Sequence, residues 1–229
     1  MNAPTQPNYK AVLFDLDGTL IDQFRAIYRC YQHALDELRL DSVTYEQVRA
    51  AVGGSIVVTF GKLIPQEYVE EAVVIFRKKF DEIWQQDTDI LPGAEWILSE
   101  LHKQGIKLCV FTNKEGDRSR HILSHLEMDH WLDGIYGTLD TPWKKPEPEF
   151  THHVVEAMGT DPAHACMVGD SPYDVASADV CNMPCFTVAT GSHTFNQLEE
   201  ETDSAGVFKD LYQLGQAVFN LTPPEDSHL

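Results

Sequence analysis

Short apolar runs alternate with helix-like segments along most of this chain, and that alternation limits the folds open to it. Parallel strands need long crossover connections, usually helices, whereas antiparallel strands can be joined by tight turns. Repeated strand–helix alternation therefore predicts an α/β fold, a parallel sheet with helices on both faces. The strands are expected at Ala11–Asp15, Ile106–Thr112, Gly134–Gly137, Ala165–Gly169 and Cys185–Val188, and the helices near Ala94–Lys103, Glu115–Leu126, Glu147–Met158 and Pro172–Ala178.

The section from residue 21 to residue 90 breaks this alternation. Apolar side chains recur there at helical spacing in two stretches, Phe24 to Leu38 and Val69 to Trp84. Two or more amphipathic helices inserted after the first strand would form a helical subdomain. We therefore predict a core of residues 9–20 and 91–220, a helical subdomain of residues 21–90, and disordered, Pro-rich tails at 1–8 and 221–229.

The first predicted strand ends in two acids, Asp15 and Asp17, which are followed by Gly18 and Thr19. The Gly and Thr interrupt the strand, so both acids lie in a tight loop at its carboxyl end, where open α/β sheets bind ligands. Such a pair can hold a divalent cation, and one acid can attack a substrate while the other transfers protons. A solvated turn is the alternative, because Asp and Gly also favour turns for local reasons.

Polar residues follow the second predicted strand and a later loop as well. Thr112 and Asn113 end the strand, where a hydroxyl can donate to a phosphoryl oxygen or simply cap a helix. Lys145 precedes Pro146, which restricts it to an extended conformation. A fixed ammonium there can neutralise a phosphoryl group, whereas Lys144 fits an exposed basic loop better.

Another apolar strand ends in Gly169 and Asp170, and Asp174 follows in the first turn of a helix that Pro172 can begin. Both acids would lie near the strand terminus, although either could merely interact with the helix N-terminus. Each of these segments is a modest signal by itself. Their conjunction indicates one polar site at the carboxyl edge of the sheet.

In order and spacing, these segments resemble the four motifs of the haloacid dehalogenase superfamily of phosphohydrolases. The resemblance spans about residues 10–219 and is closest to the phosphoglycolate-phosphatase-like branch, through Leu91-Pro92-Gly93-Ala94, Phe111-Thr112-Asn113-Lys114 and Lys145-Pro146-Glu147-Pro148. It implies a Rossmann-like core and a mobile cap made by the helical insertion. The chain departs from the family at Cys181-Asn182, where similar sequences carry a small residue and Gly; Asn tolerates the left-handed conformation there.

The resemblance also implies a reaction, the Mg²⁺-dependent hydrolysis of a phosphate monoester through a phosphoaspartyl intermediate. One acid attacks phosphorus, and a second protonates the leaving alkoxide and then activates water. The implied residues are Asp15, Asp17, Thr112 and Lys145 for catalysis; Thr112, Asn113 and Lys145 for phosphate binding; Asp15, Asp170 and the backbone carbonyl of Asp17 for the metal; and Asp174 in support of Lys145 or of the metal's water shell.

The acid at Asp17 argues against two other reactions of similar proteins. Dehalogenases of this fold lack an acid there, and the phosphonate hydrolases depart from Asp-x-Asp and use a lysine of the cap. A hexose-phosphate mutase shares all four motifs and stays an alternative, as does a catalytically idle binding protein. The sequence does not identify the ester. The residues that could contact its leaving group are Gly53-Gly54-Ser55, Arg25 and Lys62, although each of them also fits an ordinary turn or surface residue.

Composition limits the classes of partner and the cellular compartment that we expect for this protein. The formal net charge of −19 argues against binding to nucleic acids or anionic membranes. No apolar run approaches the ~20 residues that cross a bilayer. Five cysteines without a second metal-binding pair indicate reduced thiols in a cytoplasmic protein. We expect a small-molecule phosphate ester as the partner, and a monomer or a homodimer.

Overall fold

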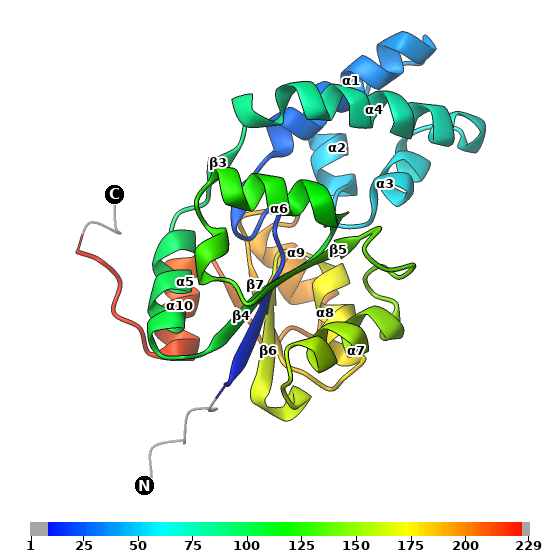
Figure 1. The fold of residues 1–229 in the computed structure, drawn as a ribbon. Coiled ribbons are helices and arrows are strands. Elements are labelled where there is room, and N and C mark those ends of the chain that lie inside the picture. The colour runs from blue at the N-terminus through cyan, green and yellow to red at the C-terminus, as the bar shows by residue number, and fades with distance from the viewer. Residues whose placement is uncertain (1–8, 226–229) are drawn as a thin grey trace, which may run out of the picture.

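The computed structural model describes residues 9–225, so most of the two predicted disordered tails, residues 1–8 and 226–229, lies outside the described part. The central feature is a six-stranded parallel sheet with the order β5-β4-β1-β6-β7-β8 (Figure 1). This sheet confirms the predicted α/β fold. Its strands are β1 (Ala11–Phe14), β4 (Lys107–Glu115), β5 (Gly134–Thr138), β6 (Ala165–Gly169), β7 (Cys185–Val188) and β8 (Gly206–Phe208).

Strand β1 lies between β4 and β6, and its four residues are completely buried. Successive side chains of a strand point to opposite faces, so Val12 and Phe14 pack into one apolar layer and Ala11 and Leu13 into the other. Helices α5, α6 and α10 complete the first layer, and α7 and α8 complete the second. The core helices are α5 (Ala94–Lys103), α6 (Gly116–His125), α7 (Pro148–Ala157), α8 (Pro172–Asp179), α9 (Phe195–Glu201) and α10 (Leu211–Phe219).

Four further helices pack on one another beyond one end of the sheet (Figure 1). Their shared core is aromatic, and the Tyr31 ring lies 4.2 Å from that of Phe60 and 5.1 Å from that of Phe76 between centroids. The chain enters and leaves this helical subdomain through two short paired strands, where the proposed domain boundaries lie. These elements are α1 (Phe24–Leu38), α2 (Tyr45–Ala51), α3 (Ile56–Leu63), α4 (Val69–Ile83), β2 (Ile21–Asp22) and β3 (Asp89–Ile90).

The remaining elements are single 3₁₀ turns: η1 (Gln66–Tyr68), η2 (Trp84–Gln86), η3 (Asp129–Trp131) and η4 (Pro162–His164). No helix within residues 9–225 has both the length and the apolar character needed to cross a bilayer.

Three details differ from the sequence prediction. Glu115 belongs to β4 and not to the following helix, because the register shifts after Phe111 and lets Glu115 pair with Thr138. The C-terminal elements β8, α9 and α10 were not predicted, since their apolar runs are short. Leu221, placed by the prediction in a disordered tail, is buried against the core. By contrast, Asn182 has a φ of +52°, so the expected left-handed turn is confirmed.

Candidate active site

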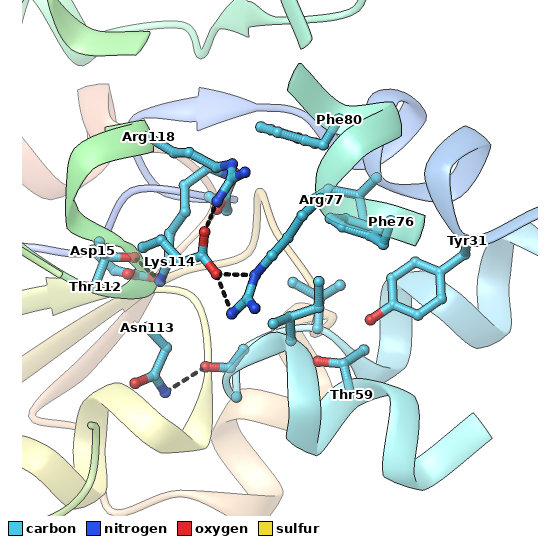
Figure 2. A pocket seen from close by; sticks show the side chains of 17 residues that line it. Asp15, Tyr31, Thr59, Phe76, Arg77, Phe80, Thr112, Asn113, Lys114 and Arg118 are labelled. Carbon is cyan, nitrogen blue, oxygen red and sulfur yellow. Dashed lines mark hydrogen bonds and ion pairs between the residues drawn. The ribbon is translucent and has the colours of Figure 1, made fainter. Parts of the chain in front are cut away.

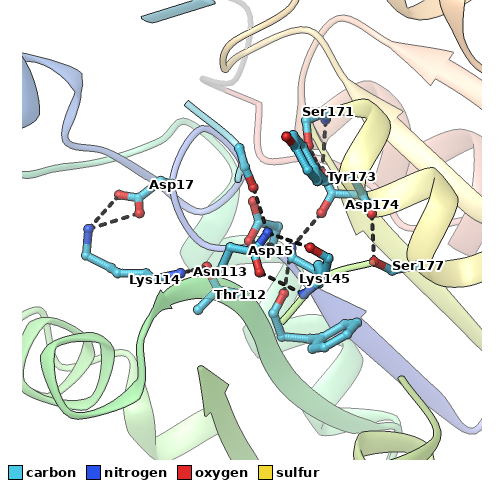
Figure 3. Close-up of polar contacts among 12 residues, drawn as sticks. Asp15, Asp17, Thr112, Asn113, Lys114, Lys145, Ser171, Tyr173, Asp174 and Ser177 are labelled. Atoms are coloured by element: carbon cyan, nitrogen blue, oxygen red, sulfur yellow. Dashed lines mark hydrogen bonds and ion pairs between the residues drawn. The ribbon is translucent and has the colours of Figure 1, made fainter. Parts of the chain in front are cut away.

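The Lys145 ammonium is the centre of a buried polar cluster at the carboxyl edge of the sheet. Its Nζ donates to Asp15 Oδ1 at 2.9 Å, to Asp174 Oδ1 at 2.7 Å and to the Phe111 carbonyl at 2.9 Å (Figure 3). The lysine side chain is only 1% exposed. The loop after β1, strand β4 and helix α8 therefore each contribute one acceptor to the same ammonium, and three segments far apart in sequence are held at one point.

The charged groups of this cluster shift one another's pKa values. Burial by itself would lower the pKa of Lys145, but the charges of Asp15 and Asp174 outweigh it and raise that pKa above its usual value. Burial, partly offset by Lys145, raises the pKa of Asp15 to about 6. Burial, reinforced by the charges of Asp174 and Asp15, raises the pKa of Asp170 to about 8. The site thus has more acidic groups than one ammonium can keep ionised.

Asp170 is held by a loop that the sequence analysis did not single out. Its Oδ2 accepts hydrogen bonds from the Ser192 backbone N–H at 2.6 Å and from the Ser192 hydroxyl at 2.8 Å. Gly191 makes this approach possible, because a Cβ there would lie 2.0 Å from the same oxygen. Gly18 has a φ of +88° and lies against Gly191. The two loops can therefore close around Asp170 only with glycine at both contact points.

Asp174 has both carboxylate oxygens occupied. Oδ1 accepts from Lys145, while Oδ2 accepts from the backbone N–H groups of Asp170 and Ser171 and from the Ser171 hydroxyl, at 2.7–3.1 Å. The Ser171 and Asp174 side chains form a capping box at the start of α8. Both readings made from the sequence therefore apply to Asp174, since it caps a helix and also orients Lys145.

Oxygen atoms of three buried carboxylates, Asp15, Asp170 and Asp174, lie within 4.8 Å of one another. Three acids facing a single ammonium suit a hard divalent cation, and carboxylate oxygens are the ligands that Mg²⁺ prefers. Because Asp174 is occupied by hydrogen bonds, Asp15 and Asp170 are the side chains best placed to hold such an ion. The donor set therefore fits the predicted metal.

Thr112 and Asn113 end the straight part of β4 beside this cluster. The Thr112 hydroxyl oxygen accepts from the Lys114 backbone N–H at 3.2 Å, which leaves the hydroxyl proton able to donate to a ligand. The Asn113 amide accepts from the Lys145 backbone N–H at 2.8 Å and donates to the carbonyls of Lys145 and Gly53. Because its side chain holds those two loops, a contact between Asn113 and phosphate would have to come from its backbone.

The Asp17 carboxylate lies apart from the three-acid group and pairs with Lys114. The Lys114 Nζ donates to both oxygens of Asp17, at 2.9 and 3.2 Å (Figure 3). It also lies 4.7 Å from the ring centroid of Phe80 on α4. Lys114 therefore touches both an acid of the β1 loop and an aromatic of the helical subdomain. The sequence analysis quoted Lys114 only as part of a motif and gave it no role.

A cavity of about 90 Å³ opens from Asp15 and Asp17 toward α1 and α4 (Figure 2). Glu115 lies in its wall and binds two arginines from different helices. Arg77 of α4 donates to Glu115 Oε1 at 2.5 Å, and Arg118 of α6 contacts Glu115 Oε2. Arg118 also makes two hydrogen bonds of 2.8 Å to Asp81. Sequence reasoning missed these residues, because the arginines lie on helix faces that carry no motif and Glu115 follows the motif at the end of β4.

The other residues that the sequence analysis named for substrate selection lie at different places relative to the cavity. Gly53 and Gly54 line the cavity, and the Gly53 carbonyl accepts from Asn113. Lys62 donates to the Ala51 carbonyl at 3.2 Å, and Arg25 is exposed; neither lines the cavity.

Comparison with known proteins identifies relatives over most of the chain. The model of the family described as haloacid dehalogenase-like hydrolase matches residues 12–188. A phosphoglycolate phosphatase of Aquifex aeolicus is 33% identical over 166 residues, which cover 72% of this chain and 78% of the relative. A putative pyrophosphatase, PpaX, of Caldanaerobacter subterraneus is 28% identical over 89% of this chain and 92% of its own. The crystal structure of a predicted phosphatase from Clostridium acetobutylicum superposes with a TM-score of 0.85 at 25% identity, covering 93% of this chain and 99% of that one.

Proposed function

Because the chain belongs to the haloacid dehalogenase-like hydrolases and is a phosphatase of the phosphoglycolate-phosphatase-like branch, we propose that it hydrolyses a small-molecule phosphate monoester through a phosphoaspartyl intermediate on Asp15. The observation that carries this proposal is the Lys145 ammonium, shared by Asp15 and Asp174 in a buried site. That arrangement places a fixed positive charge beside the oxygen proposed to attack phosphorus.

In the first step a carboxylate oxygen of Asp15 attacks phosphorus and the ester oxygen leaves. Lys145 and the Thr112 hydroxyl would stabilise the charge on the transferring oxygens. Asp17, which lines the same cavity as Asp15, would donate its proton to the departing alkoxide. The products of this step are the free alcohol and an acyl phosphate on Asp15.

In the second step Asp17, now ionised, accepts a proton from a water molecule that attacks phosphorus. The bond between phosphorus and Asp15 breaks, which releases inorganic phosphate and restores both acids. Two displacements replace one difficult substitution, and each has a lower barrier.

We propose that Mg²⁺ is held by Asp15, Asp170 and the backbone carbonyl of Asp17, where it would neutralise charge on the phosphoryl group and its nucleophile. Support comes from the three-acid cluster and from the raised pKa values of Asp15 and Asp170. Asp174 keeps Lys145 in place.

We also propose that the protein works in the cytoplasm.

We propose that the helical subdomain acts as a cap over this site. Two contacts support this role: Asn113 of β4 donates to the Gly53 carbonyl, and Arg49 of α2 donates to the Gly191 carbonyl at 2.9 Å. Both join the helical subdomain to loops that carry site residues. A cap excludes bulk water and contacts the leaving group.

The first test measures phosphate release from p-nitrophenyl phosphate in the presence of Mg²⁺ and in the presence of EDTA. The second quenches the reaction with acid during turnover of a ³²P-labelled ester and measures the label on the protein. We expect Mg²⁺-dependent release and transient labelling of the protein that hydroxylamine removes and that maps to Asp15. Turnover without labelled protein at any quench time, together with inversion of configuration at phosphorus, would exclude the covalent intermediate. Isomerisation of a hexose phosphate without net phosphate release would favour the mutase.

A further inference from the structure

The cavity beside Asp15 is walled mainly by apolar side chains of the helical subdomain. Phe76 and Phe80 stack with ring centroids 5.8 Å apart, and Tyr31 lies 5.1 Å from Phe76 (Figure 2). Ile27 and Ile56 add aliphatic surface to the same cavity. Its volume of about 90 Å³ is several times the ~10–15 Å³ that one water needs. A substrate group that enters this space is therefore removed from water and packed against apolar surface.

Among the described residues, three cations line this cavity, and each of them is paired with an acid. Lys114 donates to both oxygens of Asp17, at 2.9 and 3.2 Å. Arg77 donates to Glu115 at 2.5 Å, and Arg118 contacts Glu115 as well as an exposed aspartate of α4. The two guanidinium groups in the cavity wall are thus already paired with carboxylates of the protein.

A carboxylate on the leaving group would be unfavourable in such a cavity. It would lose its hydration, meet the negative charge of Glu115, and have to displace that carboxylate to reach Arg77 or Arg118. An uncharged group pays none of these costs, and it buries apolar area against Phe76, Phe80 and Tyr31. Pairing the cations internally therefore selects against anions as well as for apolar groups.

We propose that the leaving group is an uncharged, mainly apolar alcohol of the aryl or arylalkyl class; this inference rests on the proposed phosphatase function. It separates this chain from its relatives named phosphoglycolate phosphatase, because the glycolate leaving group is small and carries a carboxylate. The selection is made by Glu115 and the aromatic wall, which lie outside the residues assigned to phosphoryl transfer.

The direct experiment compares three esters of primary alcohols with the wild-type protein and Mg²⁺: benzyl phosphate, phosphoglycolate, and the amide of phosphoglycolate. The amide has nearly the shape of phosphoglycolate without the carboxylate charge, so it separates charge from size. We expect kcat/KM to be highest for benzyl phosphate, about tenfold or more above the amide, and lowest for phosphoglycolate.

The Glu115→Gln variant tests the charge argument within one protein. Removing the Glu115 charge takes the acid partner from Arg77 and leaves Arg118 paired with Asp81 alone, while the side-chain shape is kept. We expect the ratio of kcat/KM for phosphoglycolate to that for its amide to rise about tenfold. Because both esters are measured on the same variant, a general loss of activity cancels in this ratio. Glu149→Gln, an exposed glutamate of α7, should keep the wild-type ratio.

The outcomes separate this inference from the function on which it rests. Phosphoglycolate turned over at least as efficiently as either uncharged ester would overturn the inference and leave the phosphatase function standing. An unchanged phosphoglycolate-to-amide ratio in Glu115→Gln would overturn the role of Glu115 in selection. Absence of phosphate release from all three esters and from p-nitrophenyl phosphate would overturn the proposed function, and the inference with it.

Discussion

The two ends of the active-site cavity are built in opposite ways. At the Asp15 end, three buried carboxyl groups face the single ammonium of Lys145, so their full ionisation leaves negative charge unbalanced. At the opposite end, Arg77 and Arg118 are paired with acids, and aromatic rings line the same cavity. An unbalanced site can bind a cation and a phosphoryl group, whereas a balanced, apolar one can only select by shape and polarity. Chemistry and selection are therefore expected to respond separately to mutation.

The largest effect should come from Asp15→Asn. The amide is not a nucleophile toward phosphorus, so kcat should fall by at least about ten-thousandfold, equally for every ester. Thermal denaturation should show a folded protein, because the substitution keeps the shape and removes one of the crowded acids. A loss that differed strongly between esters would break the proposed separation between the two ends.

Asp17→Asn should follow, with a loss of about a hundredfold to ten-thousandfold in kcat, the usual contribution of a general acid or base. Esters of poor leaving groups should be affected more than p-nitrophenyl phosphate, whose phenolate needs less protonation. Steady-state kinetics on both ester types measures this. Near-normal rates on benzyl phosphate would remove Asp17 from its assigned role.

Lys145→Met should lower stability as well as abolish activity, because it leaves buried carboxylates without their cation. Breaking a buried pair in this way costs about 3–5 kcal/mol of unfolding free energy. Lys144→Met is the matched control, since that lysine is 45% exposed and lies 3.9 Å from Glu147; it should stay within about 0.5 kcal/mol of wild type. Urea denaturation gives both values, and equal stability of the two variants would contradict the coupling inferred for Lys145.

The smallest effect should be a pH-dependent stabilisation by Mg²⁺. In the folded state the pKa of Asp15 is about 6 and that of Asp170 is about 8. Both exceed the pKa of about 3.9 that an aspartic acid has in an unfolded chain. Without metal, the stability from these two groups is therefore complete below about pH 4 and is lost as pH rises through 6 and 8.

Metal binding needs the ionised carboxylates, so Mg²⁺ should stabilise the protein more at about pH 8.5 than at about pH 5.5. At a hundred times its Kd the gain would reach about 2.7 kcal/mol. Thermal denaturation with and without Mg²⁺ at the two pH values measures this, and Asp170→Asn should remove most of the gain. An equal shift at both pH values would argue against binding at the acid cluster.

The Asp15 end was largely predictable because its acids directly follow a strand or open a helix, and because Lys145 belongs to a short motif just before α7. Asp15, Lys145, Asp170 and Asp174 were all predicted, and the parallel sheet brings their loops together. Ser192, which holds Asp170, was missed because it lies in a loop without a motif. For Asn113 the prediction named the residue, but the structure shows its amide holding the Lys145 and Gly53 loops.

The amino-acid sequence by itself determined the strand–helix alternation, the helical insertion and the identity of the reactive groups, since all of these depend on local patterns. Only the tertiary structure decided which charges face one another. Arg77, Glu115 and Arg118 come from α4, β4 and α6, and nothing in their spacing shows that two guanidinium groups share one carboxylate. The electrostatic character of a pocket is a sum over side chains that meet only after packing, so it is read from distances between elements and not from order along the chain.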